Sequence, residues 1–159
     1  MRIKPDYTFD DIYSVDFEQL KKDGIKVLLF DLDSTVMPSK SAKFPNEVLE
    51  LFEKLKKDFK LAIVSNNKNK TYINSARSQV DFEVVSNAKK PDKTIILDCI
   101  KRFDEIPSNA VMIGDRPLTD ILAGKFAGTK TVLVDSITRK TEAKIVRFVR
   151  ALERVTVKK

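Results

Sequence analysis

The most constraining feature of this sequence is a series of short apolar runs that alternate with amphipathic segments. The runs lie at residues 25–30, 61–64, 82–85, 110–113 and 131–134. Each is too short for a helix and most are rich in β-branched residues, which is typical of strands buried on both faces of a parallel sheet. The segments between and after the runs predict helices near 45–59, 70–80, 92–103, 118–127 and 141–154. Regular alternation of strand and helix predicts an α/β doubly wound fold.

The composition limits the chemistry that such a fold can carry. The 159 residues include no histidine and one cysteine, Cys99, which we expect on a helix with its side chain in the protein core. Without histidine there is no His-based triad or imidazole general base, and a lone cysteine excludes a disulfide framework or a cysteine zinc cluster. With 42% apolar and 33% charged residues and no linker-like tract, we expect one domain over 1–159, with a lead-in at 1–24.

Polar residues follow each of the first four apolar runs. In a parallel sheet the carboxyl ends of the strands meet at one edge, where ligands bind. The segments at that edge are Asp31-Leu32-Asp33-Ser34-Thr35, Ser65-Asn66-Asn67, Lys89-Lys90-Pro91 and Gly114 to Asp120. They supply carboxylates for a hard cation, a hydroxyl and an ammonium for phosphate oxygens, and a carboxylate that can act as a nucleophile.

Together these segments resemble the four motifs of the haloacid-dehalogenase (HAD) phosphohydrolase superfamily. Asp31 to Thr35 resembles motif I, Ser65 motif II, Lys90 motif III, and Asp115 with Asp120 motif IV. The stretches VSNN, AKKP and GD…TDIL…AG resemble more closely the YqeG-type phosphatases of subfamily IIIA. The main departure is Ser34, where the family usually has Asn. The resemblance implies a three-layer, Rossmann-like sandwich around a five-stranded parallel sheet, with the runs in the order 5-4-1-2-3 and no cap domain.

The resemblance also implies roles for these residues. Asp31 would be the nucleophile that forms an aspartyl-phosphate, and Asp33 the general acid and base. The phosphate-binding residues would be Ser65, Asn66 and Lys90, and the supporting residues would be Thr35 and Asp120. Mg²⁺ would bind Asp31, the backbone carbonyl of Asp33, and Asp115. A divalent cation at this point would offset the repulsion between an anionic nucleophile and an anionic phosphate.

Each of these residues also has an ordinary structural interpretation. Asp120 could cap a helix, and Ser65 alone is more often a turn residue. Lys90 alone would be a surface lysine, and Lys89 is its adjacent competitor for the motif. The Asp31 and Asp33 pair is harder to explain structurally, because two acids beside an apolar strand cost stability unless a cation compensates. Receiver domains also use acids, a hydroxyl and a lysine, but their acid pair precedes the phosphoacceptor by a whole βα unit.

The spacing between the motifs leaves no room for an inserted cap domain. Only 33 residues separate Asp31 from Ser65, and 24 separate Ser65 from Lys90. We therefore expect an open site with a short flap at 37–44, whose Lys40 and Lys43 could meet an anionic substrate. An open site suits a large substrate or one that a partner covers.

The positive charge of the chain is concentrated in its last segment. Of a net charge of +7, residues 137–159 carry eight Lys and Arg against two Glu, a net of +6. We expect a basic helix near 140–155 that packs on the sheet or contacts an anionic membrane or nucleic acid. No apolar run reaches membrane-spanning length and the N-terminus lacks an apolar leader, so we expect a cytoplasmic protein, peripheral at a membrane if the helix binds one.

Two functions follow from these expectations. The first is a Mg²⁺-dependent phosphomonoesterase, and eukaryotic relatives in the subfamily that dephosphorylate phosphatidylglycerophosphate suggest a lipid phosphate as one substrate. The alternative is a non-catalytic or partner-dependent module that keeps the HAD scaffold to bind RNA, the ribosome or an anionic membrane. The intact set Asp31, Asp33, Ser65, Lys90 and Asp115 favours the enzyme.

Overall fold

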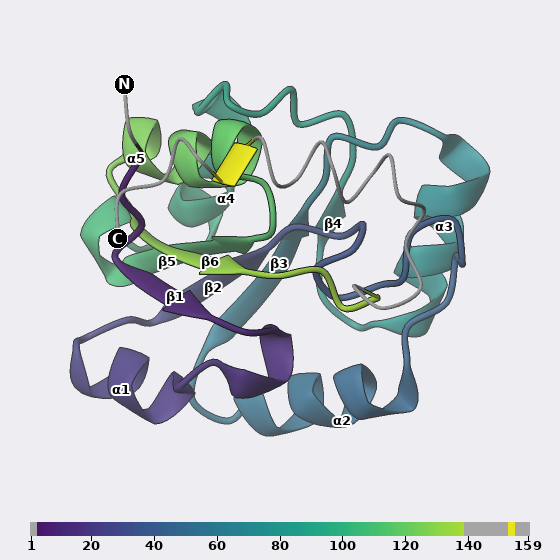
Figure 1. The fold of residues 1–159 in the computed structure, drawn as a ribbon, viewed down its shortest axis with the longest axis horizontal. Coiled ribbons are helices and arrows are strands. Elements are labelled where there is room, and N and C mark those ends of the chain that lie inside the picture. The colour runs from purple at the N-terminus through teal and green to yellow at the C-terminus, as the bar shows by residue number, and fades with distance from the viewer. Residues whose placement is uncertain (1–2, 139–152, 155–159) are drawn as a thin grey trace.

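The fold is built around a parallel sheet of six strands. The sheet crosses the middle of the molecule in Figure 1, with helices above and below it. A computed structural model describes residues 3–138 and 153–154. The strands are β1 (Tyr7–Phe9), β2 (Val27–Phe30), β3 (Lys60–Val64), β4 (Val84–Val85), β5 (Ala110–Gly114) and β6 (Lys130–Val134). Their order across the sheet is β1-β6-β5-β2-β3-β4, and every pairing is parallel. The α/β class with a parallel sheet is therefore confirmed.

The prediction of a five-stranded sheet was wrong, because the segment expected as a lead-in supplies a further strand. β1 pairs with β6 and adds a sixth strand at the sheet edge, while the five expected strands keep the order 5-4-1-2-3 among themselves, as β6-β5-β2-β3-β4. Asp6 fixes this edge: its Oδ2 accepts hydrogen bonds from the backbone N–H and the hydroxyl of Thr131, at 2.8 and 3.1 Å. Three residues are too few for an apolar period to be visible in the sequence.

Helices cover both faces of the sheet. They are α1 (Phe17–Lys22), α2 (Asn46–Leu55), α3 (Lys70–Gln79), α4 (Thr94–Arg102) and α5 (Leu122–Ala127), with short turns at Ile12–Ser14 and Pro107–Asn109. Alternate side chains of each strand point to opposite faces. On β2, Leu28 and Phe30 pack with α1, α2 and α3, whereas Val27 and Leu29 pack with α4 and α5. The result is a three-layer arrangement with the sheet in the middle.

Most helix boundaries lie close to the predicted ones, and the differences are local. The helix predicted over 45–59 corresponds to α2, which ends at Leu55. The segment expected as one helix over 118–127 is a π-helical turn, Pro117–Ile121, followed by α5. Gly128 ends α5 in the left-handed conformation, at φ 83°. Of the basic helix expected near 140–155, only Glu153 and Arg154 lie within the described residues.

Candidate active site

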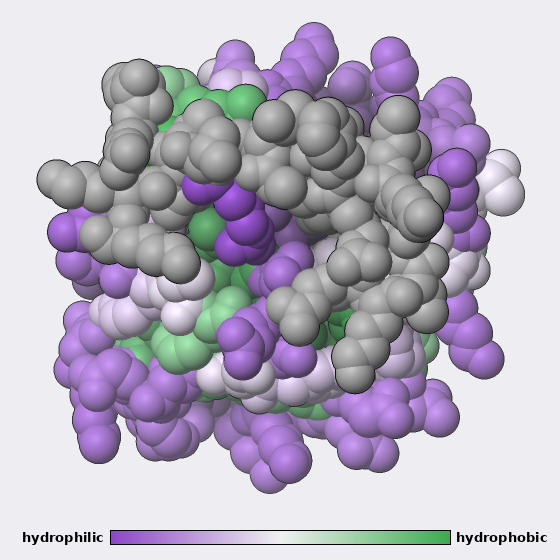
Figure 2. Space-filling model, in the orientation of Figure 1, coloured by the Kyte–Doolittle hydropathy of each residue, from purple (hydrophilic) through white to green (hydrophobic). Residues whose placement is uncertain are grey.

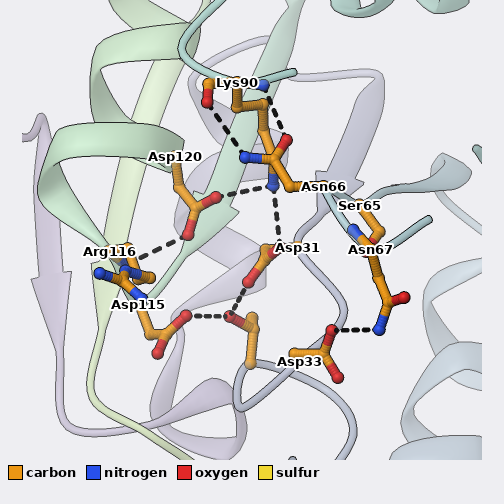
Figure 3. Close-up of polar contacts among 10 residues, drawn as sticks. Asp31, Asp33, Ser65, Asn66, Asn67, Lys90, Asp115, Arg116 and Asp120 are labelled. Carbon is orange, nitrogen blue, oxygen red and sulfur yellow. Dashed lines mark hydrogen bonds and ion pairs between the residues drawn. The ribbon is translucent and has the colours of Figure 1, made fainter. Parts of the chain in front are cut away.

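The candidate site lies where β2, β3 and β5 end, with the loop after β4 beside it (Figure 3). Parallel pairing brings these carboxyl ends to one edge, because β2 lies between β3 and β5. Asp31 directly continues β2, and its backbone N–H donates to the carbonyl of Ile113 on β5 at 2.9 Å. The sheet therefore carries Asp31 to the position from which its side chain meets residues of the other strand ends.

A tight turn after β2 separates the two acids of the Asp31-Leu32-Asp33 segment. Ser34 adopts φ 69°, and its N–H donates to the carbonyl of Met37 at 2.7 Å. Asn adopts this left-handed conformation more readily than Ser, which gives a physical reason for the Asn usual in the family. Figure 3 shows Asp31 directed toward Lys90 and Asp120, and Asp33 turned away toward Asn67.

Lys90 is the central contact of the site. Its Nζ lies 2.8 Å from Asp31 Oδ1 and 2.7 Å from Asp120 Oδ1, and its side chain is 1% exposed. Burial acts to lower the pKa of Lys90, but the carboxylates of Asp120 and Asp31 outweigh it and raise the pKa, so the ammonium stays charged. Lys89, the neighbour that could have filled the same motif, is exposed.

The side-chain amide of Asn66 holds the backbone of Lys90 in place. Asn66 Oδ1 accepts from the Lys90 N–H at 2.7 Å, and its Nδ2 donates to the Lys90 carbonyl at 3.0 Å. Both polar groups of Asn66 thus contact the main chain of the lysine that reaches the site. The geometry assigns Asn66 a positioning contact, and its expected role in phosphate binding stays a prediction.

Asp115 and Asp120 approach Asp31 from the end of β5. Thr35 Oγ1 donates to Asp115 Oδ1 at 3.0 Å and lies 3.3 Å from Asp31 Oδ2. The Arg116 N–H donates to Asp120 Oδ2 at 3.1 Å. Burial, with repulsion from Asp31, raises the pKa of Asp120 to about 6, while the Lys90 ammonium opposes the rise.

Three of these carboxylates could hold a metal ion. One oxygen each from Asp31, Asp115 and Asp120 lies within 4.8 Å of the others, and all three residues are buried. With Asp31, Asp115 and Asp120 ionised against the single ammonium of Lys90, the buried group carries a formal charge of −2. Oxygen ligands and a deficit of two positive charges fit a hard divalent cation such as Mg²⁺.

Asp33 and Ser65 lie apart from the buried acid cluster. Asp33 Oδ2 accepts from Asn67 Nδ2 at 3.2 Å, and Asp33 is only half-buried. Ser65 is buried at the end of β3, and its Oγ accepts from the Asn67 N–H at 3.0 Å. The second acid therefore contributes no side-chain oxygen to the three-carboxylate group, and a role for it in metal binding is limited to its backbone carbonyl.

Two residues that contact Asp33 were not recognised from the sequence. Asn67 lies in the quoted VSNN stretch but received no role, because an amide after a strand is an ordinary turn residue. Tyr72 lies in the first turn of α3, where its hydroxyl donates to the Pro38 carbonyl at 3.5 Å. Burial, together with the nearby Asp33 carboxylate, raises the pKa of this phenol to about 12. Its sequence context, an aromatic residue on a helix, carries no signal that distinguishes it from a core residue.

Comparison with known proteins identifies the family. A family model described as mitochondrial PGP phosphatase matches residues 1–138. The chain belongs to this family. It is 29% identical over 166 residues to phosphatidylglycerophosphate phosphatase 1, chloroplastic/mitochondrial, of Arabidopsis thaliana, covering 99% of this chain and 48% of that protein. It therefore spans about half the length of this plant member of the PGP phosphatase family.

A bacterial relative matches over most of both chains. The probable phosphatase YqeG of Bacillus subtilis is 29% identical over 151 residues, covering 94% of this chain and 87% of that one. Together with the family match, this confirms the expected membership of the HAD superfamily of phosphatases and the expected resemblance to YqeG.

Solved structures support the fold of this PGP phosphatase family member. A HAD phosphatase from Thermococcus onnurineus aligns with a TM-score of 0.58 at 17% identity, covering 75% of this chain and 89% of that one. An uncharacterised protein from Listeria monocytogenes aligns with a TM-score of 0.56 at 21% identity, covering 69% and 78%. At these identities the likeness concerns the fold alone.

Proposed function

We propose that this protein is a Mg²⁺-dependent phosphomonoesterase that forms an aspartyl-phosphate on Asp31. The observation that carries the proposal is the accessibility of this acid within the cluster. The Asp31 side chain keeps 12% of its surface exposed, against 2% for Asp120 and 1% for Lys90. Asp31 is thus the carboxylate that an incoming phosphate meets, with an ammonium at 2.8 Å to hold its orientation.

Two displacements would follow at phosphorus. In the first, the second carboxylate oxygen of Asp31 attacks, the ester bond breaks, and Asp33 gives a proton to the leaving oxygen. In the second, Asp33 takes a proton from water, which attacks the aspartyl-phosphate and releases inorganic phosphate. The hydrogen bond from Asn67 and the contact with Tyr72 support this role, because they hold Asp33 near the site without drawing it into the acid cluster.

Lys90, Ser65 and the metal ligands would stabilise the transferring group. Lys90 and the hydroxyl of Ser65 would donate to the equatorial phosphate oxygens, where charge spreads in the transition state. Asp31, Asp115 and the backbone carbonyl of Asp33 would hold Mg²⁺, with Thr35 and Asp120 as supporting residues. The bound cation would offset the negative charge that the acid cluster and the phosphate share.

For the substrate, we propose the phosphomonoester of a glycerophospholipid such as phosphatidylglycerophosphate. The family description and the name of the Arabidopsis relative both support this class. The spacing of the site residues supports it as well, because α2 is the only helix between Asp31 and Ser65 and α3 the only one between Ser65 and Lys90 among the described residues. Neither interval contains a domain that would exclude a lipid headgroup.

The test is phosphate release from a panel of phosphatidylglycerophosphate, sugar phosphates, nucleotides and p-nitrophenyl phosphate. We expect release with Mg²⁺, its loss in EDTA, and a fall of about 1,000-fold or more for Asp31→Asn. Asp98→Asn, which changes an exposed acid on α4, is the matched control and should keep wild-type turnover. Equal release from Asp31→Asn and wild type would contradict the proposal. Folded protein that binds RNA or anionic vesicles without turnover on any substrate would favour a non-catalytic module instead.

A further inference from the structure

Most of the large exposed apolar side chains lie on or near α5. Among the described residues, four large apolar side chains are strongly exposed: Tyr13, Ile106, Leu118 and Phe126. Leu118 and Phe126 lie on the π-helical turn and on α5, and are 42% and 55% exposed. With half-buried Leu122 between them, they recur every fourth residue, which places all three on one side of the continuous helical segment.

Ile106 extends this apolar surface at the far end of α5. It is 58% exposed and directly precedes Pro107. The Pro107 side chain lies 3.7 Å from the point where a Cβ on Gly128 would stand, so the two segments meet where α5 ends. We call Ile106, Leu118, Leu122 and Phe126 the α5 face. In Figure 2, apolar side chains reach the surface at the upper edge, at the end of the molecule where α4 and α5 lie.

Along the helical part of the α5 face the exposed charged side chains are positive, whereas Asp104 and Glu105 precede Ile106, and Glu153 pairs with Arg116 at 3.2 Å. Within residues 116–134 the exposed charged side chains are those of Arg116, Lys125 and Lys130, and the single acid, Asp120, is buried. A hollow of about 480 Å³ opens where α5 ends. Its lining consists of Asp6, Ser108, Lys125, Gly128, Thr129 and Lys130. The Asp6 carboxylate, which accepts two hydrogen bonds from Thr131, keeps its negative charge, so Lys125 and Lys130 leave the hollow with a formal charge of +1.

The α5 face begins at the rim of the candidate site. Asp115 belongs to the three-carboxylate group, Arg116 follows it, and Leu118 is two residues further on. A planar surface in contact with this face would therefore lie next to the site. An interface that combines protruding apolar side chains with basic ones is complementary to a lipid headgroup layer over an acyl interior.

We propose that the α5 face docks this protein on an anionic phospholipid surface, with Phe126 and Leu118 inserted between headgroups and Lys125 and Lys130 contacting lipid phosphates. The inference deepens the proposed function and rests on its lipid substrate, because docking at this face brings a membrane-borne phosphomonoester to the rim that leads to Asp31. Double-stranded nucleic acid fits the face less well, because its bases are stacked inside the duplex and its phosphate backbone offers no apolar partner for exposed Phe and Leu side chains.

The test measures binding of the full-length chain to vesicles by flotation. We expect binding to phosphatidylcholine vesicles that contain phosphatidylglycerol, weaker binding to pure phosphatidylcholine, and a decrease with added salt. Phe126→Asp should reduce binding about tenfold or more, because it removes a large apolar side chain and adds a negative charge. Tyr13→Asp is the matched control, because it makes the same change at an exposed aromatic residue outside the α5 face.

Two further readouts separate this inference from the proposed function. Phe126→Asp should keep wild-type release of phosphate from soluble p-nitrophenyl phosphate and lose release from a vesicle-borne substrate. Wild-type chain that fails to bind anionic vesicles, or equal losses for Phe126→Asp and Tyr13→Asp, would overturn the docking surface while leaving the phosphatase proposal standing. Conversion of a dimer to a monomer by Phe126→Asp, with vesicle binding unchanged, would overturn it as well and assign the face to self-association. Vesicle binding without turnover on any substrate would instead contradict the proposed function.

Discussion

At the scale of single residues, the site depends on how closely its side chains approach one another. Lys90 contacts two carboxylates at 2.7 and 2.8 Å, and Thr35 contacts a third at 3.0 Å. Such a group is stable only while its charges remain paired. Small displacements of one member should therefore affect the whole site.

Gly114 provides the space that Asp120 occupies. A Cβ added at Gly114 would lie 2.4 Å from Asp120 Cγ, so Gly114→Ala must displace this carboxylate from Lys90. We expect phosphate release to fall about tenfold or more, since misplaced site residues lose catalytic geometry. Gly24→Ala is the control: it adds a side chain at φ 89°, with nothing within 4 Å, and should cost roughly 1 kcal/mol of stability without changing turnover of the folded protein. Wild-type turnover in Gly114→Ala would contradict the positioning of Asp120.

Asp120 should make the stability of metal-free protein depend on pH. Burial, with repulsion from Asp31, raises its pKa from 3.8 to about 6, so between these values the folded protein keeps a proton that the unfolded chain has lost. The contribution of Asp120 to the free energy of unfolding therefore falls as pH rises through this window. In EDTA, wild type should lose about 1 kcal/mol relative to Asp120→Asn between pH 5 and pH 7.

Urea unfolding of both proteins at the two pH values measures this difference. Saturating Mg²⁺ should remove most of it, because a cation bound by the cluster favours the ionised carboxylate. A difference between wild type and Asp120→Asn that is the same at pH 5 and pH 7 in EDTA would show that the Asp120 pKa is not raised.

At the residue scale, the sequence predicted which residues lie together at the sheet edge, but not the individual hydrogen bonds that each of them makes. Asp31 follows β2, Lys90 follows β4, and Asp115 and Asp120 both follow β5. Parallel pairing alone predicts that these three strand ends converge. The contacts of Asn66 with the Lys90 main chain and of Asn67 with Asp33 depend on loop conformations that a periodic pattern does not encode. The catalytic roles of these residues stay predictions.

At the scale of elements, the strand β1 is the part of the fold that the sequence concealed. Apolar runs of four to six residues predicted the other five strands, whereas Tyr7–Phe9 is a three-residue edge strand with half-buried and exposed side chains. Its place in the sheet depends on tertiary contacts, above all on Asp6, which binds both the backbone and the side chain of Thr131.

Replacing Asp6 tests whether the N-terminal segment stabilises the sheet edge. Asp6→Ala leaves the Thr131 donors without this acceptor and should cost about 1–3 kcal/mol in the free energy of unfolding. Asp6→Asn keeps an acceptor oxygen, so its loss in the free energy of unfolding should be less than half of the loss in Asp6→Ala. Chemical unfolding of the three proteins gives both values. If both variants match wild type, the contact between Asp6 and β6 contributes nothing to stability.

At the scale of the whole molecule, helices cover both faces of the sheet, and the site lies at the carboxyl ends of its strands. α1, α2 and α3 cover one face, α4 and α5 cover the other, and the carboxyl ends of the strands remain for the acid cluster and Lys90. The alternation of strand and helix predicted this architecture because both faces of a parallel sheet must be covered. The α5 face was not predicted, because exposure of Leu118 and Phe126 is set by how the helix packs.

The described residues contain no helix that is both long and apolar enough to cross a membrane. The sequence expectation of a basic helix near 140–155 falls outside the described residues, apart from Glu153 and Arg154. Glu153 accepts a hydrogen bond from the Arg116 side chain at 3.2 Å, and the Arg154 side chain donates to the Val134 carbonyl at 2.8 Å.

The measurement that tests the central claim most directly is the stereochemical course at phosphorus. Hydrolysis of a phosphorothioate monoester made chiral at phosphorus with one heavy oxygen isotope, in water labelled with another, gives a chiral thiophosphate whose configuration distinguishes one displacement from two. Each in-line displacement inverts phosphorus, so attack by Asp31 followed by attack of water on the aspartyl-phosphate predicts overall retention. Overall inversion would mean that water attacks the substrate directly and that Asp31 never carries the phosphoryl group.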